Sequence, residues 1–462
     1  MSSTFAIVVL ALSIPVMVGL FFVMRPVRAA LAVALGAEMF LPEWVTLKVP
    51  LMPPFDKHNL PYLCILVACL LRCPGRVTKL PRERWMLVMA LLLLAGGVLT
   101  SLTNGDTLIL GTNGQVVIPG LNLKDGFYMG ISEFLCTLLP LYLGYALLRK
   151  SEDFEDLVAG LAIAGMVYVP FVMIELRMSP QMHRWIYGYA QHDFLQTIRW
   201  GGYRPMVFMS HGLAVARFLL TSVFCLVILG RYRRALLGLP VRFLAWTQFL
   251  VLVACKSTGA IVFALVGIPL VALARPKRQL LVAALLASII VLYPALRLFD
   301  VVPVARILEA AGAMQADRAD SLAYRFNNED AVLAHARERI LFGWGEYDRN
   351  AVHDVDGQKI SVLDGYWIIR LSINGVLGFI TAFGPLLIPV LWARRRLSSF
   401  TRERDQWLVA GVAFTLTLIT LDLIPNGLFA YSPYLIAGAL TRRLRELKAE
   451  ARERELETQP TS

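Results

Sequence analysis

Residues 4–24 read TFAIVVLALSIPVMVGLFFVM and contain no charged side chain. A helix of about 20 apolar residues is long enough to cross the hydrocarbon core of a bilayer. Comparable apolar runs recur along the 462-residue chain, which is 57% hydrophobic and 17% charged and has a mean hydropathy of +0.62. This composition excludes an ordinary soluble enzyme and predicts an all-α polytopic membrane protein.

The apolar runs predict about 12–13 membrane-spanning helices. They occupy residues 4–24, 27–41, 59–71, 85–103, 127–148, 157–176, 205–230, 243–255, 260–274, 279–296, 366–392, 406–421 and 428–440. The first two runs decide between the two counts, because the loss of one crossing would leave both ends of the chain on the inner side.

Basic residues separate the apolar runs and predict the orientation of the chain. Clusters of Lys and Arg fall at every second junction, at Arg25/Arg28, Arg72 to Arg84, Arg149/Lys150, Arg231 to Arg242, Arg275 to Arg278, Arg394 to Arg404 and from Arg442 onward. Such clusters favour the cytoplasmic side of a membrane. The net charge of +12 is therefore distributed between spans rather than gathered on one soluble face, and no nucleic-acid partner is expected.

The longest connection on the opposite, external side covers residues 297–365. A loop of this length is expected to carry structure of its own. Asn327 or Asn328 can cap a helix near 328–341, and Gly343 can end it. The expected organisation is therefore transmembrane helices with short external loops at 1–296, the large external loop at 297–365, transmembrane helices at 366–440 and a charged cytoplasmic tail at 441–462.

The external connection 177–204 leads into the sequence RWGGYRP at residues 199–205. Its glycines allow a sharp turn, and Pro205 is suited to open the next helix. Arg204 would then lie at the membrane face, with His211 two turns inside the helix. Interfacial snorkelling is the alternative role for this arginine, because aromatic residues surround it.

Lys256 and Arg325 are two further cationic candidates on the external side. Lys256 separates two short apolar runs that must form a hairpin or a re-entrant dip. Arg325 lies between Tyr324 and Phe326, and an arginine held in this way suits bidentate recognition of phosphate. The alternatives are snorkelling for Lys256 and a structural salt bridge for Arg325. Asp364, at the start of the next span, can act as a base or neutralise these cations.

Charged residues also occur within the apolar runs, at Glu133, Arg217, Arg370 and Asp422. Ion pairs between helices would account for them, but the sequence does not show which residues pair. All six cysteines lie in or beside apolar runs, so no disulfide or metal cluster is expected. No cofactor is expected either.

Four segments, in this order, resemble the O-antigen ligase and Wzy-type polysaccharide polymerase superfamily. They are Tyr203–Arg204–Pro205 followed by Ser210–His211–Gly212; Ser257–Thr258–Gly259–Ala260; Tyr324–Arg325–Phe326 through Gly343–Trp344–Gly345; and Asp364–Gly365–Tyr366 followed by Gly375 and Gly378. The resemblance covers roughly residues 85–440 and includes the layout of many spans with one large late loop.

The resemblance implies a GT-C-like helical fold in the bacterial inner membrane. It also implies metal-independent, inverting transfer of a glycan from undecaprenyl diphosphate at the periplasmic face. Arg204 and Arg325 match family arginines that engage the diphosphate. The chain departs from the family at Ser257–Thr258–Gly259, where members often have Ser-Arg-Gly, so Lys256 is the neighbouring substitute cation. It departs again at Asp364, where ligases carry a histidine, and this favours a polymerase.

The resulting hypothesis is a polysaccharide polymerase that extends a lipid-linked repeat unit. The expected site residues are Arg204, Arg325, Lys256, Arg199 and His211 for the diphosphate, Asp364, then Glu346 and His353, as the base, and Tyr203, Trp344 and Tyr366 for sugar stacking. Expected partners are undecaprenyl-diphosphate-linked oligosaccharides, membrane lipid and a chain-length regulator protein. The alternatives are an O-antigen ligase acting on a lipid A-core acceptor, a lipid-linked glycan transporter or flippase, and a non-enzymatic assembly or sensing component.

Overall fold

The computed structural model describes residues 3–50, 52–112, 114, 116–314, 316–396, 402–427 and 430–457. The described residues are mostly helical, and their strands form two-stranded hairpins, β1–β2, β3–β4 and β5–β6. The elements are α1 (Thr4–Val23), α2 (Pro26–Phe40), α3 (Leu60–Arg72), α4 (Pro74–Val77), α5 (Arg84–Thr103), β1 (Leu108–Leu110), β2 (Val116–Ile118), α6 (Leu123–Glu133), the π-helix η1 (Phe134–Leu138), α7 (Leu139–Leu147), α8 (Ser151–Met178), α9 (Met182–Tyr187), the 3₁₀ turn η2 (Leu195–Thr197), β3 (Ile198–Arg199), β4 (Gly202–Tyr203), α10 (Gly212–Leu229), β5 (Ala235–Leu236), β6 (Leu239–Pro240), α11 (Val241–Ala254), α12 (Thr258–Leu273), α13 (Pro276–Leu298), α14 (Val304–Met314), α15 (Ala316–Glu338), α16 (Tyr366–Arg396), α17 (Glu403–Asp422) and α18 (Ser432–Glu457).

The predicted apolar runs fall on helices, and the run at 127–148 forms the continuous segment α6–η1–α7. Within the described residues, 7 helices are long and apolar enough to cross a membrane: α1, α5, α6–α7, α8, α10, α13 and α16. Three shorter apolar helices, α3, α11 and α12, accompany them. The prediction of an all-α polytopic membrane protein is confirmed, whereas the number of crossings and the GT-C likeness stay predictions.

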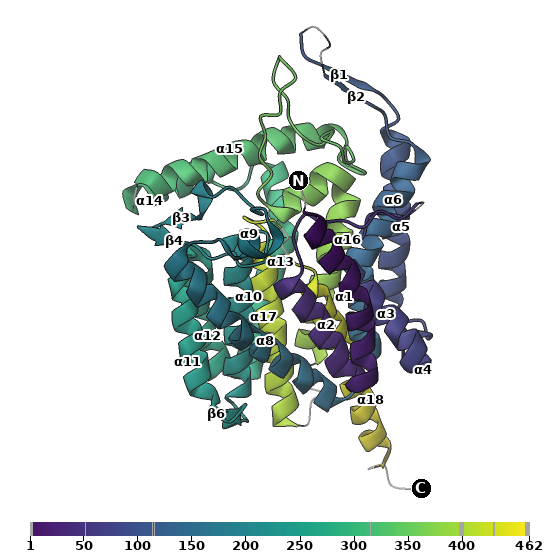
Figure 1. The fold of residues 1–462 in the computed structure, drawn as a ribbon, viewed down its shortest axis with the longest axis vertical. Coiled ribbons are helices and arrows are strands. Elements are labelled where there is room, and N and C mark those ends of the chain that lie inside the picture. Colours follow the sequence, from purple (N-terminus) through teal and green to yellow (C-terminus); the bar gives the residue numbers. More distant parts are fainter. Residues whose placement is uncertain are drawn as a thin grey trace.

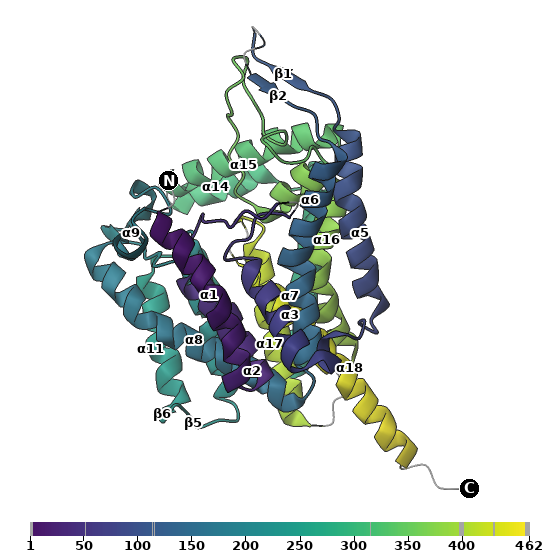
Figure 2. The same ribbon diagram turned by 45° about the vertical axis from the view of Figure 1, so that its right-hand side comes forward.

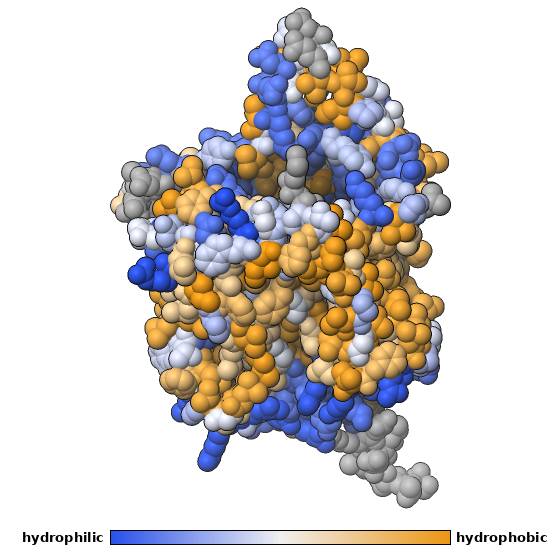
Figure 3. All heavy atoms as spheres, viewed as in Figure 1, coloured by the Kyte–Doolittle hydropathy of each residue, from blue (hydrophilic) through white to orange (hydrophobic). Residues whose placement is uncertain are grey.

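The long helices run side by side along one axis, and α14 and α15 lie across one end of the bundle (Figures 1 and 2). On the face drawn in the space-filling view, a hydrophobic belt crosses the middle, and hydrophilic side chains gather at both ends (Figure 3). A bilayer exposes its hydrocarbon core to such a belt and its head groups to the polar ends. The crossing helices α14–α15 therefore lie outside the hydrocarbon region.

The helix of the large loop starts earlier than predicted. α15 begins at Ala316, so Arg325 lies within it, and neither asparagine acts as its N-terminal cap. The Asn328 side chain instead donates to the Tyr324 carbonyl at 2.9 Å and accepts from the Val362 amide at 2.9 Å. The helix ends at Glu338, and Gly343, with φ +71°, completes the turn that follows.

The helix after Arg204 starts later than predicted. Pro205 does not open it, because residues 205–211 are not helical and α10 begins at Gly212. His211 therefore lies at the N-terminal cap, where its side chain accepts from the Leu213 amide at 3.0 Å. Val207, with φ +53°, shows that this segment follows a path a helix cannot take.

The last predicted span and the charged tail form a single helix, α18. Residues 428 and 429 of that span and residues 458–462 of the tail lie outside the described residues.

The arrangement predicts that the 348–362 segment and the β5–β6 turn lie on opposite sides of the membrane. Asp356→Cys and Leu237→Cys, each at an exposed position, test this in a Cys73→Ser background, because the other native cysteines are buried. A membrane-impermeant maleimide should label Cys at 356 in intact cells, and Cys at 237 only after permeabilisation. Labelling of both positions from the same side would contradict this topology.

Candidate functional site

Arg204 follows a tight β-hairpin at the end of the bundle crossed by α15. β3 and β4 pair antiparallel, and the two residues between them, Trp200 and Gly201, both have positive φ, at +47° and +65°. Such a two-residue turn matches the twist of the paired strands. The hairpin places Arg199 opposite Gly202 and delivers Arg204 directly after β4.

Buried polar side chains hold the non-helical segment that follows Arg204. Glu175, at the end of α8, accepts from the amides of Met206 at 2.8 Å and Val207 at 2.7 Å. Lys57 donates to the Phe208 carbonyl at 2.9 Å. Backbone groups that are buried outside a helix need such partners, because each one left unpaired costs about 1–3 kcal/mol. The backbone behind Arg204 is therefore fixed from several directions.

Two glycines make room for two cations of the site. A Cβ on Gly212 would lie 2.2 Å from Arg204 Cδ, and a Cβ on Gly202 would lie 2.1 Å from Lys256 Nζ. Lys256 forms the turn between α11 and α12 with φ +54°. Whether this helix pair crosses the membrane or dips into it stays a prediction. The Lys256 ammonium donates to the Trp200 carbonyl at 3.4 Å, and its own carbonyl accepts from Arg204 Nη2 at 3.2 Å.

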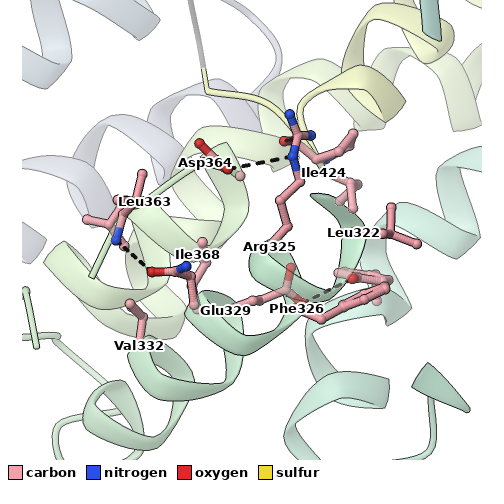
Figure 4. A pocket seen from close by; sticks show the side chains of 14 residues that line it. Leu322, Arg325, Phe326, Glu329, Val332, Leu363, Asp364, Ile368 and Ile424 are labelled. Carbon is pink, nitrogen blue, oxygen red and sulfur yellow. Dashed lines mark hydrogen bonds and ion pairs between the residues drawn. The ribbon is translucent and has the colours of Figure 1, made fainter. Parts of the chain in front are cut away.

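Arg325 reaches the same region from α15. Its Nε lies 3.7 Å from Asp364 Oδ2, and its Nη1 donates to the Pro425 carbonyl at 3.3 Å. The arginine and aspartate side chains are 39% and 41% exposed. Both line a pocket of about 110 Å³, in which Arg325 extends from its helix toward Asp364 and the segment at Ile424 (Figure 4).

We call Arg199, Arg204, Lys256 and Arg325 the cationic cluster. Burial, followed by repulsion from Arg199 and Arg325, lowers the pKa of the largely buried Arg204 to about 10. The positive charges of Arg199, Arg204 and Arg325 also act on the pKa of His211. Burial, the neighbouring His192 and these arginines lower the pKa of His211 to about 3, which keeps its imidazole neutral at physiological pH. Like charges held together in this way create a site for an anion.

Glu329 is a second carboxylate in the pocket that sequence reasoning missed. It lies one turn after Arg325 on α15, accepts from Arg297 Nε at 2.6 Å and from the Tyr293 hydroxyl at 3.0 Å, and lines the same cavity. Burial raises the pKa of Glu329, although Arg297 opposes this shift. Glu329 follows Arg325 by four residues, which places both side chains on one face of a helix. This spacing could have indicated Glu329 as a site residue if the sequence had predicted a helix that includes Arg325.

The structure places Glu346 and His353 apart from the Asp364 pocket. Burial and the charge of Glu133 raise the pKa of Glu346, so this residue lies near Glu133, at the end of α6, instead. His353 forms an isolated backbone bridge with Lys359 in the outer loop. Burial lowers the pKa of His353. Neither is among the described residues that line the pocket.

The predicted sugar-stacking aromatics occupy different surroundings. Tyr203 is half-buried beside Arg204, with its ring centroid 5.9 Å from that of Phe194. Trp344 is buried and stacks on the His335 ring at 4.2 Å. Tyr366 is also buried, within α16. Of the three, Tyr203 is the ring that the structure places with the cationic cluster.

The charged residues within the spans form inter-helix contacts. Glu133 and Arg370 make an ion pair between α6 and α16, as the ion-pair hypothesis predicted. Arg217 of α10 shares one small cavity with Glu38 of α2 and another with Asp422 of α17. Opposite charges placed near one another in this way allow charged groups to be buried between helices.

Replacing Gly202 with alanine should disturb the cationic cluster without unfolding the protein. The new Cβ would displace the Lys256 ammonium, which is the far end of a flexible side chain. We expect binding of inorganic pyrophosphate, measured by calorimetry in detergent, to weaken about tenfold, or ~1.4 kcal/mol. Gly259→Ala is the matched control, because no atom lies within 4 Å of a Cβ there. Equal affinities for the two variants would argue against a role for Lys256.

The depressed pKa of His211 predicts acid sensitivity. Between its usual pKa of 6.5 and about 3, the unfolded chain binds a proton that the folded chain does not, so stability falls as pH falls through this range. His211→Asn removes this titration and keeps an acceptor for the cap. From pH 7 to pH 4.5, the melting temperature should fall less in this variant than in the wild type. Equal losses would show that His211 is not held neutral.

Comparison with protein-family models matches residues 243–383 to Wzy_C, the O-antigen ligase family. The match supports membership of the O-antigen ligase and Wzy superfamily, whose members are glycosyltransferase-like enzymes. The matched segment contains Lys256, Arg325 and Asp364, whereas Arg199 and Arg204 precede it. A search of curated proteins found no match.

Proposed function

We propose that this superfamily member is a polysaccharide polymerase of the bacterial inner membrane. It would transfer a growing glycan from undecaprenyl diphosphate to a lipid-linked repeat unit at the periplasmic face. The observation that carries the proposal is the convergence of Arg199, Arg204, Lys256 and Arg325 at one end of the bundle, outside the hydrocarbon region, where Arg325 also pairs with Asp364. A lipid diphosphate carries its negative charge at this depth, and its polyprenyl tail lies in the bilayer.

The cationic cluster fits the chemistry of the leaving group. In the proposed step, an acceptor hydroxyl oxygen forms a bond to the anomeric carbon of the donor while the bond from that carbon to the diphosphate oxygen breaks. Configuration inverts because one displacement occurs, and the bond electrons leave with the diphosphate. Cations that are already in place at a low-dielectric boundary stabilise this developing charge without reorganising during the reaction.

Asp364 is the proposed acceptor of the hydroxyl proton. Its carboxylate is paired with Arg325, so a diphosphate that binds this arginine competes for the same guanidinium and frees the carboxylate. A positioned base typically contributes ~10²–10⁴-fold to the rate. Glu346 and His353 adjoin other groups, and Glu329 already accepts from Arg297 and Tyr293. Asp364 is therefore the carboxylate that the proposal assigns to the acceptor hydroxyl.

An O-antigen ligase is the second candidate, because the matching family carries that description. Both enzymes would use the same clamp on the diphosphate and would differ in the acceptor. Asp364, at the position where the resemblance places a histidine in ligases, favours the polymerase. A chain-length regulator protein would be a partner of the polymerase.

The experiment that tests the function supplies the purified, reconstituted protein with lipid-linked repeat unit alone. A polymerase should lengthen the glycan, as resolved on gels, whereas a ligase would leave it unchanged until a lipid A-core acceptor is added. Absence of transfer to either acceptor would contradict a glycosyltransferase.

In this assay, Arg204→Ala and Arg325→Ala should each lower the rate of transfer about 10²–10³-fold, as the loss of one charge-stabilising donor does elsewhere. Arg204→Lys should also lose activity, because an ammonium does not reproduce the bidentate guanidinium. Arg306→Ala, which removes an exposed arginine of α14 at the same end of the bundle, is the control and should keep normal activity. Normal chain lengths in the folded Arg204 and Arg325 variants would exclude the clamp.

A further inference from the structure

A large apolar groove lies between α10, α11 and α12, at the end of the bundle opposite the cationic cluster. Its volume is about 510 Å³. The side chains that line it include Val223 and Leu226 of α10, Trp246 and Phe249 of α11, and Leu265 and Pro269 of α12. The much smaller Asp364 pocket does not share a residue with it.

The packing of the three helices accounts for the groove. α11 and α12 meet at the Lys256 turn, and below this turn each packs mainly on α10 rather than on the other (Figure 1). Pro269 lacks an amide hydrogen and interrupts the hydrogen-bond ladder of α12 within the groove wall. The helices therefore separate toward their other ends, and the space between them is lined by apolar side chains.

Two arginines mark the polar end of the groove. Arg231 follows α10 and Arg242 lies in the first turn of α11, and both are exposed residues of the lining. The Arg231 guanidinium lies 3.8 Å from the centroid of the Trp407 ring, which fixes its position. The chain contains no acidic residue between Asp193 and Asp300, so the sequence that forms these helices supplies no carboxylate to neutralise the two arginines.

We propose that this groove binds an anionic phospholipid from the leaflet on the side opposite the cationic cluster. The phosphate would lie against Arg231 and Arg242, and an acyl chain would lie along Trp246 and Phe249. The dimensions agree with one leaflet, because seven residues separate Arg242 from Phe249. This is a helical rise of about 10 Å, within a hydrocarbon half-thickness of about 15 Å.

The position of the charges favours a phospholipid over the polyprenyl donor of the proposed reaction. The donor diphosphate would bind beyond the Lys256 turn, whereas the groove carries its own arginines at the other ends of the same helices. A head group anchored there must belong to the other leaflet. The inference therefore stands independently of the proposed function.

The test measures lipid binding by native mass spectrometry. The delipidated protein is titrated with phosphatidylglycerol and with phosphatidylethanolamine of the same acyl chains. We expect tighter binding of phosphatidylglycerol, and about tenfold weaker binding in Arg242→Gln. Ala245→Phe, which adds a ring to the groove lining, should reduce binding of both lipids. Arg278→Gln, an exposed arginine in the first turn of α13 at the same end of the bundle, should leave binding unchanged.

Three results would overturn the proposal. The first is equal affinity for the two phospholipids. The second is unchanged phosphatidylglycerol binding in Arg242→Gln or in Ala245→Phe, with melting temperatures confirming that both variants are folded. The third is that Ala245→Phe abolishes the binding of a polyprenyl phosphate and leaves phosphatidylglycerol binding intact. This result would assign the groove to a polyprenyl tail. Arg242→Gln should not alter glycan transfer, so a failure here is distinguishable from a failure of the glycosyltransferase proposal.

Discussion

Repulsion among positive charges at the edge of a low-dielectric bundle is the constraint on which the site depends. Burial, followed by repulsion from Arg199 and Arg325, lowers the pKa of Arg204. A buried cation among like charges stays in place only if its surroundings hold it there. Glu175 and Lys57 fix the backbone behind Arg204, and glycines give the side chains room. An anion that occupied the cluster would relieve the repulsion, which agrees with the diphosphate of the proposed function.

The transverse helix α15 joins this cluster to the carboxylates. It carries Arg325 and Glu329 one turn apart, above the bundle, and Arg297 of α13 holds the second of these from below. Asp364 lies just before α16, the helix that returns the chain to the membrane, and it pairs with Arg325 at the pocket. In the proposed function, the cations that would bind the diphosphate and the Asp364 carboxylate that would accept the proton are therefore adjacent, although distant segments of the chain supply them. At the opposite end of the bundle, Arg231 and Arg242 are exposed and flank an apolar groove, which suits a lipid head group instead.

The sequence predicts the helices well because the bilayer imposes one requirement, an apolar run of sufficient length, that is visible without any contact. The same reasoning places Lys256 between two short apolar helices, α11 and α12, as the structure has it. Local signals failed where distant side chains compete for the backbone. Pro205 was suited to start a helix, but the two backbone amides that follow it donate hydrogen bonds to the Glu175 carboxylate instead. Asn328 was suited to a cap, but it bonds within α15 and to Val362. The position of Glu329 in the pocket and the identity of the charged neighbours of Arg217 depend on how separate helices pack, and residue spacing alone does not predict this packing.

The most direct measurement of the central claim is the cryo-electron-microscopy structure of the protein in a lipid nanodisc with a non-transferable polyprenyl diphosphate. The account predicts diphosphate density within hydrogen-bonding distance of Arg204, Lys256 and Arg325, with Asp364 turned from the arginine toward the acceptor side. Diphosphate density elsewhere, for example at the Glu133–Arg370 pair or at Arg231 and Arg242, would contradict it.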